Sequence, residues 1–206
     1  MNEIKFIYFD VGGVLLLDFS GTNKWEKMKK DLGVEGETAK KLDLFWKENE
    51  QRFCRGNDLD EALPEFSQKL GIIFPNGYSM LQDFVKRLDL NPFIWPLAKA
   101  AKEKYKVGLL TNMYPNMLSL IQKKKLIPSL DWDEIADSSI IRSKKPDQKI
   151  YEVAEQKTGV KPQEILFVDN VLENVEAAKN RGWQTFLYDV GNPEKSSKEL
   201  AKILFF

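Results

Sequence analysis

The chain has 206 residues, 43% of them hydrophobic, and its 31 basic and 31 acidic residues give a formal net charge of zero. This balance excludes a general nucleic-acid or membrane-surface binder, so neither partner is expected. Histidine is absent and Cys54 is the single cysteine, which excludes histidine-dependent triads, intrachain disulfides and zinc sites built from these residues. Any metal should be a hard, oxygen-ligated cation such as Mg²⁺. Without an apolar leader or membrane span, a cytoplasmic protein is expected.

The first predicted element is a strand that ends in a carboxylate. The short run Ile7–Val11 is rich in β-branched and aromatic residues, which predicts a strand buried on both faces of a parallel sheet. Asp10 lies at its carboxyl end and is followed by Gly12 and Gly13. A carboxylate at a buried strand is costly unless it is paired, bound to metal or placed where ligands bind. The alternative is that Asp10 belongs to an ordinary Gly-Gly turn.

Residues 19–90 show almost only helical patterns. Apolar side chains recur at helical spacing in four stretches with short connections, which predicts a small four-helix bundle. Asp58, with Glu61 three residues later, has the pattern of a capping box at the start of the third helix. The expected helices are residues 25–32, Thr38–Arg55, Asp58–Leu70 and Tyr78–Leu88.

From Pro92 onward, helical and strand patterns alternate, which predicts an α/β fold with a Rossmann-like parallel sheet and right-handed crossovers. The core should therefore comprise residues 1–17 and 91–206, with residues 18–90 inserted as a helical domain. The strands expected after the first are Lys106–Asn112, Glu134–Ser139, Ile165–Asn170 and Gln184–Asp189, and the helices are Phe93–Tyr105, Pro115–Lys125, Asp147–Thr158, Val171–Arg181 and Pro193–Leu204.

Polar residues end three of the apolar strands. They are Asp10, Thr111–Asn112 and Asp169–Asn170, and Lys145 lies in the loop between the latter two. Because the carboxyl ends of parallel strands share one edge, these residues should surround one crevice. Each could instead cap a helix or face solvent. Together they suit phosphate chemistry, which needs a nucleophile, a carboxylate for Mg²⁺, and donors for phosphoryl oxygens.

The chain contains four segments in this order, Phe9–Leu15, Leu110–Asn112, Lys145–Asp147 with Ile150–Tyr151, and Phe167–Asn170 leading to Asn174 and Ala177–Ala178. Together they resemble the four motifs of the haloacid dehalogenase-like (HAD) hydrolase superfamily, and the resemblance covers the whole chain. The inserted helices stand where this family carries a four-helix cap domain. The nearest resemblance is to the branch with glycine in motif one, which includes sugar-phosphate phosphatases and the phosphatase-like domain of epoxide hydrolases.

The resemblance implies a Mg²⁺-dependent phosphatase of a small phosphorylated metabolite. Asp10 would form an aspartyl-phosphate, Thr111 and Asn112 would bind the phosphoryl group, and Lys145 would neutralise charge on both. The implied metal ligands are Asp10, the carbonyl of Gly12, Asp169 and Asn170.

Two departures from the motifs bear on activity. Gly12 stands where the family usually has a second aspartate, whose proton transfer is typically worth about 10²–10⁴-fold in rate. Asn170 stands where an aspartate is usual, so metal affinity should fall. Glu173 could compensate, although its position favours a helix surface.

Three readings of function stay open. A 2-haloacid dehalogenase needs neither Mg²⁺ nor an acid, which suits Gly12 and Asn170, but the aromatic residue that family has at position 12 is absent, as is its aspartate near Asn174. A degenerate member would bind a phosphorylated ligand or a protein partner. If the chain is a phosphatase, Arg52 and Arg55 are the inserted residues to watch for substrate recognition, or else they face solvent. The sequence leaves the oligomeric state open.

Overall fold

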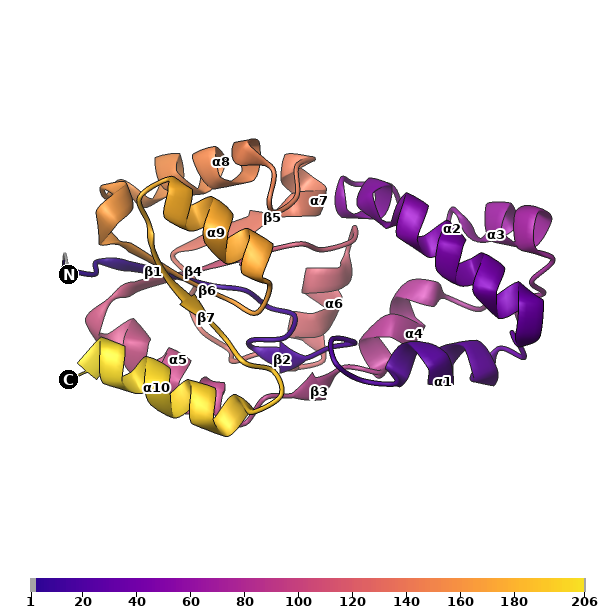
Figure 1. The fold of residues 1–206 in the computed structure, drawn as a ribbon, viewed down its shortest axis with the longest axis horizontal. Helices are drawn as coiled ribbons and strands as arrows, with labels where there is room; N and C mark the ends of the chain where they lie inside the picture. Colours follow the sequence, from indigo (N-terminus) through magenta and orange to yellow (C-terminus); the bar gives the residue numbers. More distant parts are fainter. Residues whose placement is uncertain (1–2, 206) are drawn as a thin grey trace.

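The computed structural model describes residues 3–205 and contains a five-stranded parallel sheet with helices on both faces (Figure 1). The expected α/β fold with a parallel core is confirmed. Residues 1, 2 and 206 of the expected core lie outside the described residues. The strand order is β5-β4-β1-β6-β7, formed by β1 (Phe6–Phe9), β4 (Lys106–Thr111), β5 (Glu134–Asp137), β6 (Ile165–Asp169) and β7 (Gln184–Leu187).

Alternate residues of the central strand β1 pack into two different cores. Phe6 and Tyr8 belong to a cluster with residues of α8 and α9, whereas Ile7 and Phe9 join a larger cluster that includes α5 and α10. All four side chains are at most 1% exposed, as expected for a strand covered on both faces. The surrounding helices are α5 (Ile94–Lys104), α6 (Met117–Lys123), α7 (Ser138–Ile141), α8 (Gln148–Thr158), the 3₁₀ turn η1 (Pro162–Glu164), α9 (Leu172–Asn180) and α10 (Pro193–Phe205).

Residues 18–90, called here the helical block, extend from the sheet at the carboxyl end of β1 (Figure 1). The chain enters and leaves the block through a two-stranded antiparallel ribbon, β2 (Leu16–Leu17) and β3 (Asp89–Leu90), which was not predicted. Strands of two residues carry no readable periodicity. The division into core and inserted domain remains a prediction. The block contains α1 (Lys24–Asp31), α2 (Gly36–Cys54), α3 (Leu63–Leu70) and α4 (Met80–Lys86).

The predicted cap at Asp58 is wrong. Its Oδ1 accepts hydrogen bonds from the backbone N–H groups of Asp60 (2.7 Å) and Glu61 (3.2 Å), and α3 begins only at Leu63. Asx turns and N-caps use the same side-chain-to-backbone bonds, so the sequence pattern does not separate them. The strand predicted to reach residue 139 ends at Asp137. The Asp137 side chain instead caps α7, because it accepts a hydrogen bond from the backbone N–H of Ser139 (2.8 Å).

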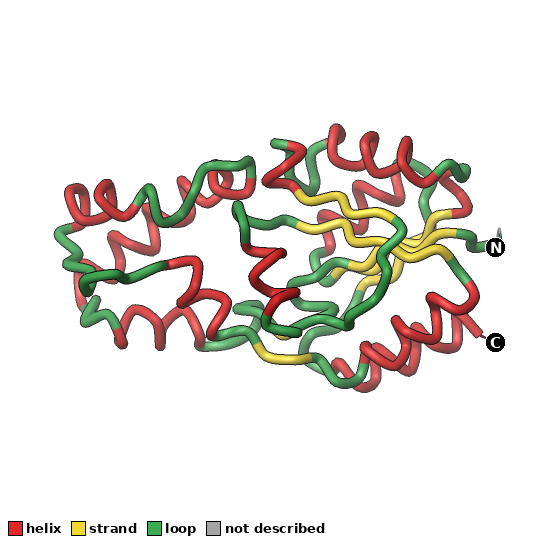
Figure 2. Tube along the Cα trace, turned by 180° about the vertical axis from the view of Figure 1, so that it is seen from behind, coloured by secondary structure: helices red, strands yellow, loops and turns green. Residues whose placement is uncertain are grey.

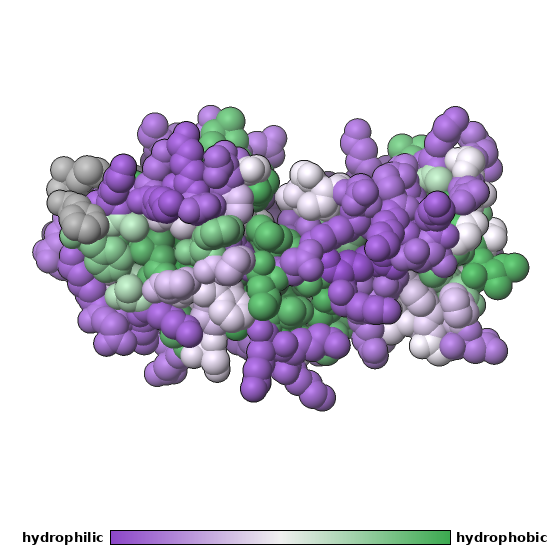
Figure 3. Space-filling view, turned by 90° about the horizontal axis from the view of Figure 1, so that it is seen from below, coloured by the Kyte–Doolittle hydropathy of each residue, from purple (hydrophilic) through white to green (hydrophobic). Residues whose placement is uncertain are grey.

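The two parts of the molecule differ in architecture and meet at an apolar junction. Figure 2 shows the five-stranded sheet confined to one part and helices in both. On the face drawn in Figure 3, hydrophilic side chains cover most of the surface, and apolar side chains gather where the helical block meets the core. Within residues 3–205, no helix is both long and apolar enough to cross a bilayer.

Candidate active site

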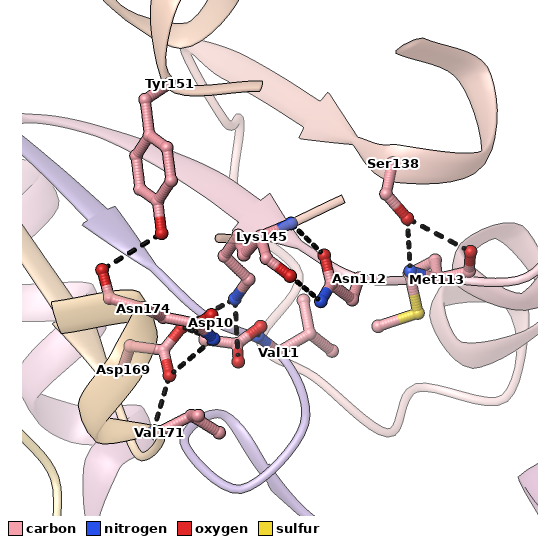
Figure 4. A network of polar contacts seen from close by, with 10 residues as sticks. All are labelled: Asp10, Val11, Asn112, Met113, Ser138, Lys145, Tyr151, Asp169, Val171 and Asn174. Carbon is pink, nitrogen blue, oxygen red and sulfur yellow. Dashed lines mark hydrogen bonds and ion pairs between the residues drawn. The ribbon is translucent and has the colours of Figure 1, made fainter. Parts of the chain in front are cut away.

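Lys145 joins two carboxylates at the carboxyl end of the sheet (Figure 4). Its Nζ lies 2.9 Å from Asp10 Oδ2 and 2.6 Å from Asp169 Oδ2. The Lys145 side chain is 1% exposed and that of Asp169 is fully buried, so each charge depends on the others for compensation. The structure therefore brings together three of the residues selected from the sequence.

The sheet register explains why the two carboxylates meet. Phe9 lies opposite Val168 of the neighbouring strand, so Asp10 and Asp169 follow at the same level. The backbone N–H of Asp10 donates to the carbonyl of Val168 (2.9 Å) and holds this level beyond β1. Like charges on adjacent strands repel, and Lys145 between them offsets that repulsion.

Asn112 holds the loop that delivers Lys145. Its Oδ1 accepts from the backbone N–H of Lys145 (2.8 Å) and its Nδ2 donates to the Lys145 carbonyl (3.1 Å), across a segment that continues through a cis Lys145–Pro146 bond. Both ends of the Asn112 amide are thus occupied. Thr111 differs, because its Oγ1 is buried and has no hydrogen-bond partner among the described residues.

Several hydrogen-bond donors hold the Asp169 carboxylate in place. Its Oδ1 accepts from the backbone N–H of Val171 (2.7 Å), and the Asn174 Nδ2 donates to both oxygens (3.2 and 3.1 Å). The Tyr151 hydroxyl in turn donates to the Asn174 carbonyl (2.9 Å). Asn174 and Tyr151 belong to the matched motifs, but no role was predicted for them. In this arrangement Asp169 orients Lys145 and balances its charge.

The buried charges shift one another's proton affinities. The pKa of Asp10 is raised to about 7, first by burial and also by the nearby Asp169 carboxylate, while Lys145 and the backbone N–H of Val11 act in the opposite direction. Burial opposes the charged form of Lys145, but Asp10 and Asp169 outweigh it and hold the pKa of Lys145 above its ordinary value. The lysine is therefore a permanent cation beside a carboxylate whose ionisation depends on nearby positive charge.

A cavity of about 400 Å³ opens over Asp10 and Lys145. Thr111 and Asp169 do not line it, and both are fully buried. The sheet side contributes the polar or small residues Asp10, Gly12, Asn112, Lys145, Asn170 and Asn174, and also the apolar or aromatic residues Leu16, Met113, Tyr114, Met117, Ile121 and Val171. The helical block contributes the aromatic residues Phe19, Trp25, Trp46 and Phe84, the acidic residues Asp18 and Glu50, and also Ser20, Cys54 and Leu88.

Asp18 occupies the space beside Gly12. A Cβ built on Gly12 would lie 2.6 Å from Asp18 Oδ2, a separation similar to that between the Cβ and a carboxylate oxygen within one aspartate. The other oxygen of Asp18 accepts from the backbone N–H of Ser20 (2.8 Å), which orients the group. A carboxylate is therefore present next to position 12, although residue 12 is glycine.

The sequence held no signal for this placement of Asp18. The backbone N–H of Leu16 donates to the carbonyl of Val11 (3.0 Å) and folds the chain back on itself. This short reversal continues into the ribbon formed by β2 and β3, which has no recognisable pattern in the sequence. Asp18 therefore returns to the level of Gly12 through an element that was not predicted.

Oxygen atoms suited to a divalent cation lie beside Asp10. Asn170 lines the cavity, and its buried Oδ1 has no hydrogen-bond partner among the described residues. Its amide packs on Gly13, where a Cβ would lie 2.5 Å away and φ is +76°. Asp10, Gly12 and Asn170 all line the cavity, and their carboxylate, main-chain and amide oxygens are of the kinds that Mg²⁺ prefers. Residues 3–205 contain no group of three His, Cys, Asp or Glu that could hold a metal, so the donors include neutral oxygens.

The inserted residues singled out for substrate recognition do not reach this cavity. Arg52 pairs with Glu65, and Arg55 Nη2 lies 2.8 Å from Asp147 Oδ2. Both arginines line a separate hollow, which residues of the helical block form together with Pro115 and Arg142 of the core. Glu173 is exposed and does not line the cavity, in keeping with a helix surface position.

A comparison with known families shows to which family the chain belongs. A family model described as haloacid dehalogenase-like hydrolase matches residues 4–182, which is most of the sequence. Together with the parallel sheet and the carboxylates at its edge, this match defines the class of protein. The chain belongs to the haloacid dehalogenase-like hydrolases.

Curated relatives include hydrolases of different lengths. The protein called Phosphatase MT3486 of Mycobacterium tuberculosis is 27% identical over 199 residues, covering 91% of this chain and 88% of that protein. Bifunctional epoxide hydrolase 2 of Rattus norvegicus is 24% identical, covering 70% of this chain but only 27% of its own length. The chain thus spans nearly all of the first relative and about a quarter of the second.

Solved structures share the fold. A HAD-like hydrolase from Porphyromonas gingivalis matches with a TM-score of 0.77 and 24% identity over all of both chains. The HAD enzyme bt-2542 from Bacteroides thetaiotaomicron, an Asp-to-Ala mutant solved with magnesium and inorganic phosphate, matches with a TM-score of 0.75 and 18% identity, covering 91% of this chain and 95% of its own. The L-2-haloacid dehalogenase of Xanthobacter autotrophicus gives 0.62 and 22%, covering 88% and 76%. At these identities the likeness concerns the fold alone.

Proposed function

We propose that this hydrolase is a Mg²⁺-dependent phosphomonoesterase that acts on a small phosphorylated metabolite through an aspartyl-phosphate on Asp10. The observation that carries the proposal is the Asp10–Lys145–Asp169 arrangement, of which Asp10 and Lys145 line the cavity. A buried carboxylate next to a fixed cation can approach an anionic phosphate, because the lysine offsets repulsion between them. The phosphatase name of the Mycobacterium tuberculosis relative agrees with this chemistry.

The chain's own residues account for both bond-breaking steps. An oxygen of Asp10 bonds to phosphorus while the bond from phosphorus to the ester oxygen breaks, and that oxygen takes a proton from the Asp18 carboxyl. Water then attacks the phosphorus of the aspartyl-phosphate and loses its proton to the Asp18 carboxylate, which releases phosphate and restores Asp10. Lys145, which lines the cavity, binds the phosphoryl oxygens.

The metal would be held by Asp10, Asn170 and the carbonyl of Gly12. When bound, Mg²⁺ supplies positive charge that neutralises the phosphoryl oxygens. Asn170 contributes an oxygen without charge, so we expect weaker metal binding than an aspartate would give. Asp169 completes the site by holding Lys145, because its own oxygens already accept from Asn174, Val171 and the lysine.

We also propose that the helical block, residues 18–90, acts as a cap domain over the cavity. It contributes Trp46 and Phe84 to the wall facing Asp10 and Lys145. Such a wall excludes water from the reacting groups and selects the alcohol part of the ester. The ribbon of β2 and β3 joins the block to the core at a narrow two-strand connection.

A substrate screen with and without Mg²⁺ tests the proposal on the wild type and on Asp10→Asn. The proposal expects metal-dependent release of phosphate that is lost in the variant. Metal-independent release of chloride from a 2-chloroacid would instead identify a dehalogenase. Absence of turnover together with absence of Mg²⁺ binding would identify a degenerate family member that only binds ligands.

A further inference from the structure

The half of the cavity that faces the helical block is walled by aromatic rings. Trp46 lies 5.3 Å from Phe84 at an interplanar angle of 87°, and 6.0 Å from Tyr114 at 90°. Trp25 adds a fourth ring, 5.2 Å from Trp46. All four residues line the cavity. At these separations the rings touch one another, so they form one packed aromatic wall. This wall and the cavity space directly beside it are here called the aromatic chamber.

A carboxylate lies in the same wall. Glu50 follows Trp46 by four residues on α2, so the two side chains share one face of the helix, and both line the cavity. The Tyr114 hydroxyl points to Glu50 Oε1 at 3.5 Å. Burial, with Cys54, Glu50 and Asp18 nearby, raises the pKa of Tyr114 well above its ordinary value, so this hydroxyl stays neutral.

No unpaired cation lies at the aromatic chamber among the described residues, since Lys29, 5.9 Å over the Trp25 ring, does not line the cavity and pairs with Glu26 and Asp43. Lys145 is the one basic residue on the cavity wall of the part that the structure describes, and it is held by Asp10 and Asp169. Arg52 and Arg55 pair with acidic residues outside the cavity. A second anionic group on the substrate would therefore lie near the carboxylates of Glu50 and Asp18, without a cation to compensate its charge.

From the rings and the carboxylate, we infer that the substrate's alcohol part carries a substituted ammonium group, seated in the aromatic chamber beside Glu50. Aromatic faces attract quaternary and alkylated ammonium ions, and a nearby carboxylate adds Coulomb attraction. The volume of about 400 Å³ suits a small amino-alcohol phosphate. This inference rests on the proposed function, because it takes the phosphate to lie at Asp10.

The test compares two esters that differ in one atom. Phosphocholine carries the quaternary nitrogen, and 3,3-dimethylbutyl phosphate replaces that nitrogen by carbon at nearly the same size. The wild type should show a kcat/KM ratio of about tenfold or more in favour of phosphocholine. Glu50→Gln should lower the ratio by about threefold or more, because the Coulomb attraction is lost while the rings remain. Glu48→Gln, an exposed change on the same helix, should leave the ratio unaltered.

The outcomes separate this inference from the proposed function. If both esters are hydrolysed in an Asp10-dependent manner with a ratio near one, the inference is overturned and the function stands. If no phosphomonoester turns over, the function fails, and calorimetry with choline against 3,3-dimethyl-1-butanol decides the inference alone. Binding of choline that weakens in Glu50→Gln supports the chamber, and equal or absent binding of the two alcohols overturns it.

Discussion

The two halves of the cavity are built in different ways. On the sheet side, Asp10 and Asp169 stand at one level because neighbouring strands fix their register, and Lys145 is held between them by Asn112. On the block side, Trp46 and its neighbouring rings come from helices joined to the core by a short ribbon. The sheet side, whose charged groups are held in place, is therefore suited to breaking bonds, and the aromatic block side is suited to selecting among substrates.

Removal of the central cation tests the sheet half most severely. Lys145→Met should abolish phosphatase activity and lower the free energy of unfolding by about 3–5 kcal/mol, because it leaves two buried carboxylates uncompensated. Chemical denaturation and phosphate release measure the two effects. Lys144→Met, a half-buried neighbour, serves as the matched control. An active and fully stable Lys145→Met protein would contradict the account of the site.

Asp18, the proposed proton donor, lies at the border between the two halves of the cavity. Asp18→Asn should slow hydrolysis of alkyl phosphates by about 10²–10⁴-fold. Hydrolysis of 4-nitrophenyl phosphate should fall far less, because nitrophenolate leaves without protonation. The dependence of kcat on leaving-group basicity measures this difference. An equal loss on both ester types would remove Asp18 from proton transfer.

Restoring the family's usual aspartate should fail unless Asp18 is removed. Gly12→Asp would place its Cβ 2.6 Å from Asp18 Oδ2, so we expect a loss of about 1–3 kcal/mol from overpacking, with added charge repulsion. The double variant Gly12→Asp with Asp18→Gly should recover stability and activity. Thermal unfolding of the three proteins checks the coupling, and simple additivity of the two changes would speak against shared space.

The smallest expected effect concerns Asn170, a proposed ligand of the metal. Asn170→Asp adds a negative charge to the oxygen set beside Asp10 and should raise Mg²⁺ affinity by roughly tenfold, or about 1.4 kcal/mol. Titration of phosphate release with Mg²⁺ gives the half-saturating concentration in each protein. Unchanged or weaker Mg²⁺ dependence would place the metal away from residue 170.

Much of the sheet was predictable, because a strand buried on both faces appears as an apolar run. Ile165–Asp169 and Lys106–Thr111 occur as expected, and their polar ends were recognised. The contacts made by those ends were not predictable. Asn112 lines the cavity and also accepts a hydrogen bond from the Lys145 backbone. Thr111 is buried and does not line the cavity. Such details depend on loop conformation, which hydrophobic periodicity does not describe.

The block side was harder to predict for two physical reasons. Helical periodicity separates buried from exposed faces, but Trp46 on a cavity wall and Phe53 in a core satisfy it equally. Polar residues in turns are also ambiguous, so Asp58 was given a helix cap that it does not form, and Asp18 was given no role. Arg52 and Arg55 illustrate the same limit, since their ion pairs lie across separate elements.

The central claim is that Asp10 carries the phosphoryl group, and trapping that group tests it most directly. The protein is mixed with a phosphomonoester and Mg²⁺, quenched in acid within the first turnover, digested and examined by mass spectrometry. We predict phosphate on the peptide that contains Asp10, and none in Asp10→Asn. Turnover without phosphate on that peptide, or the same label in the variant, would contradict the account.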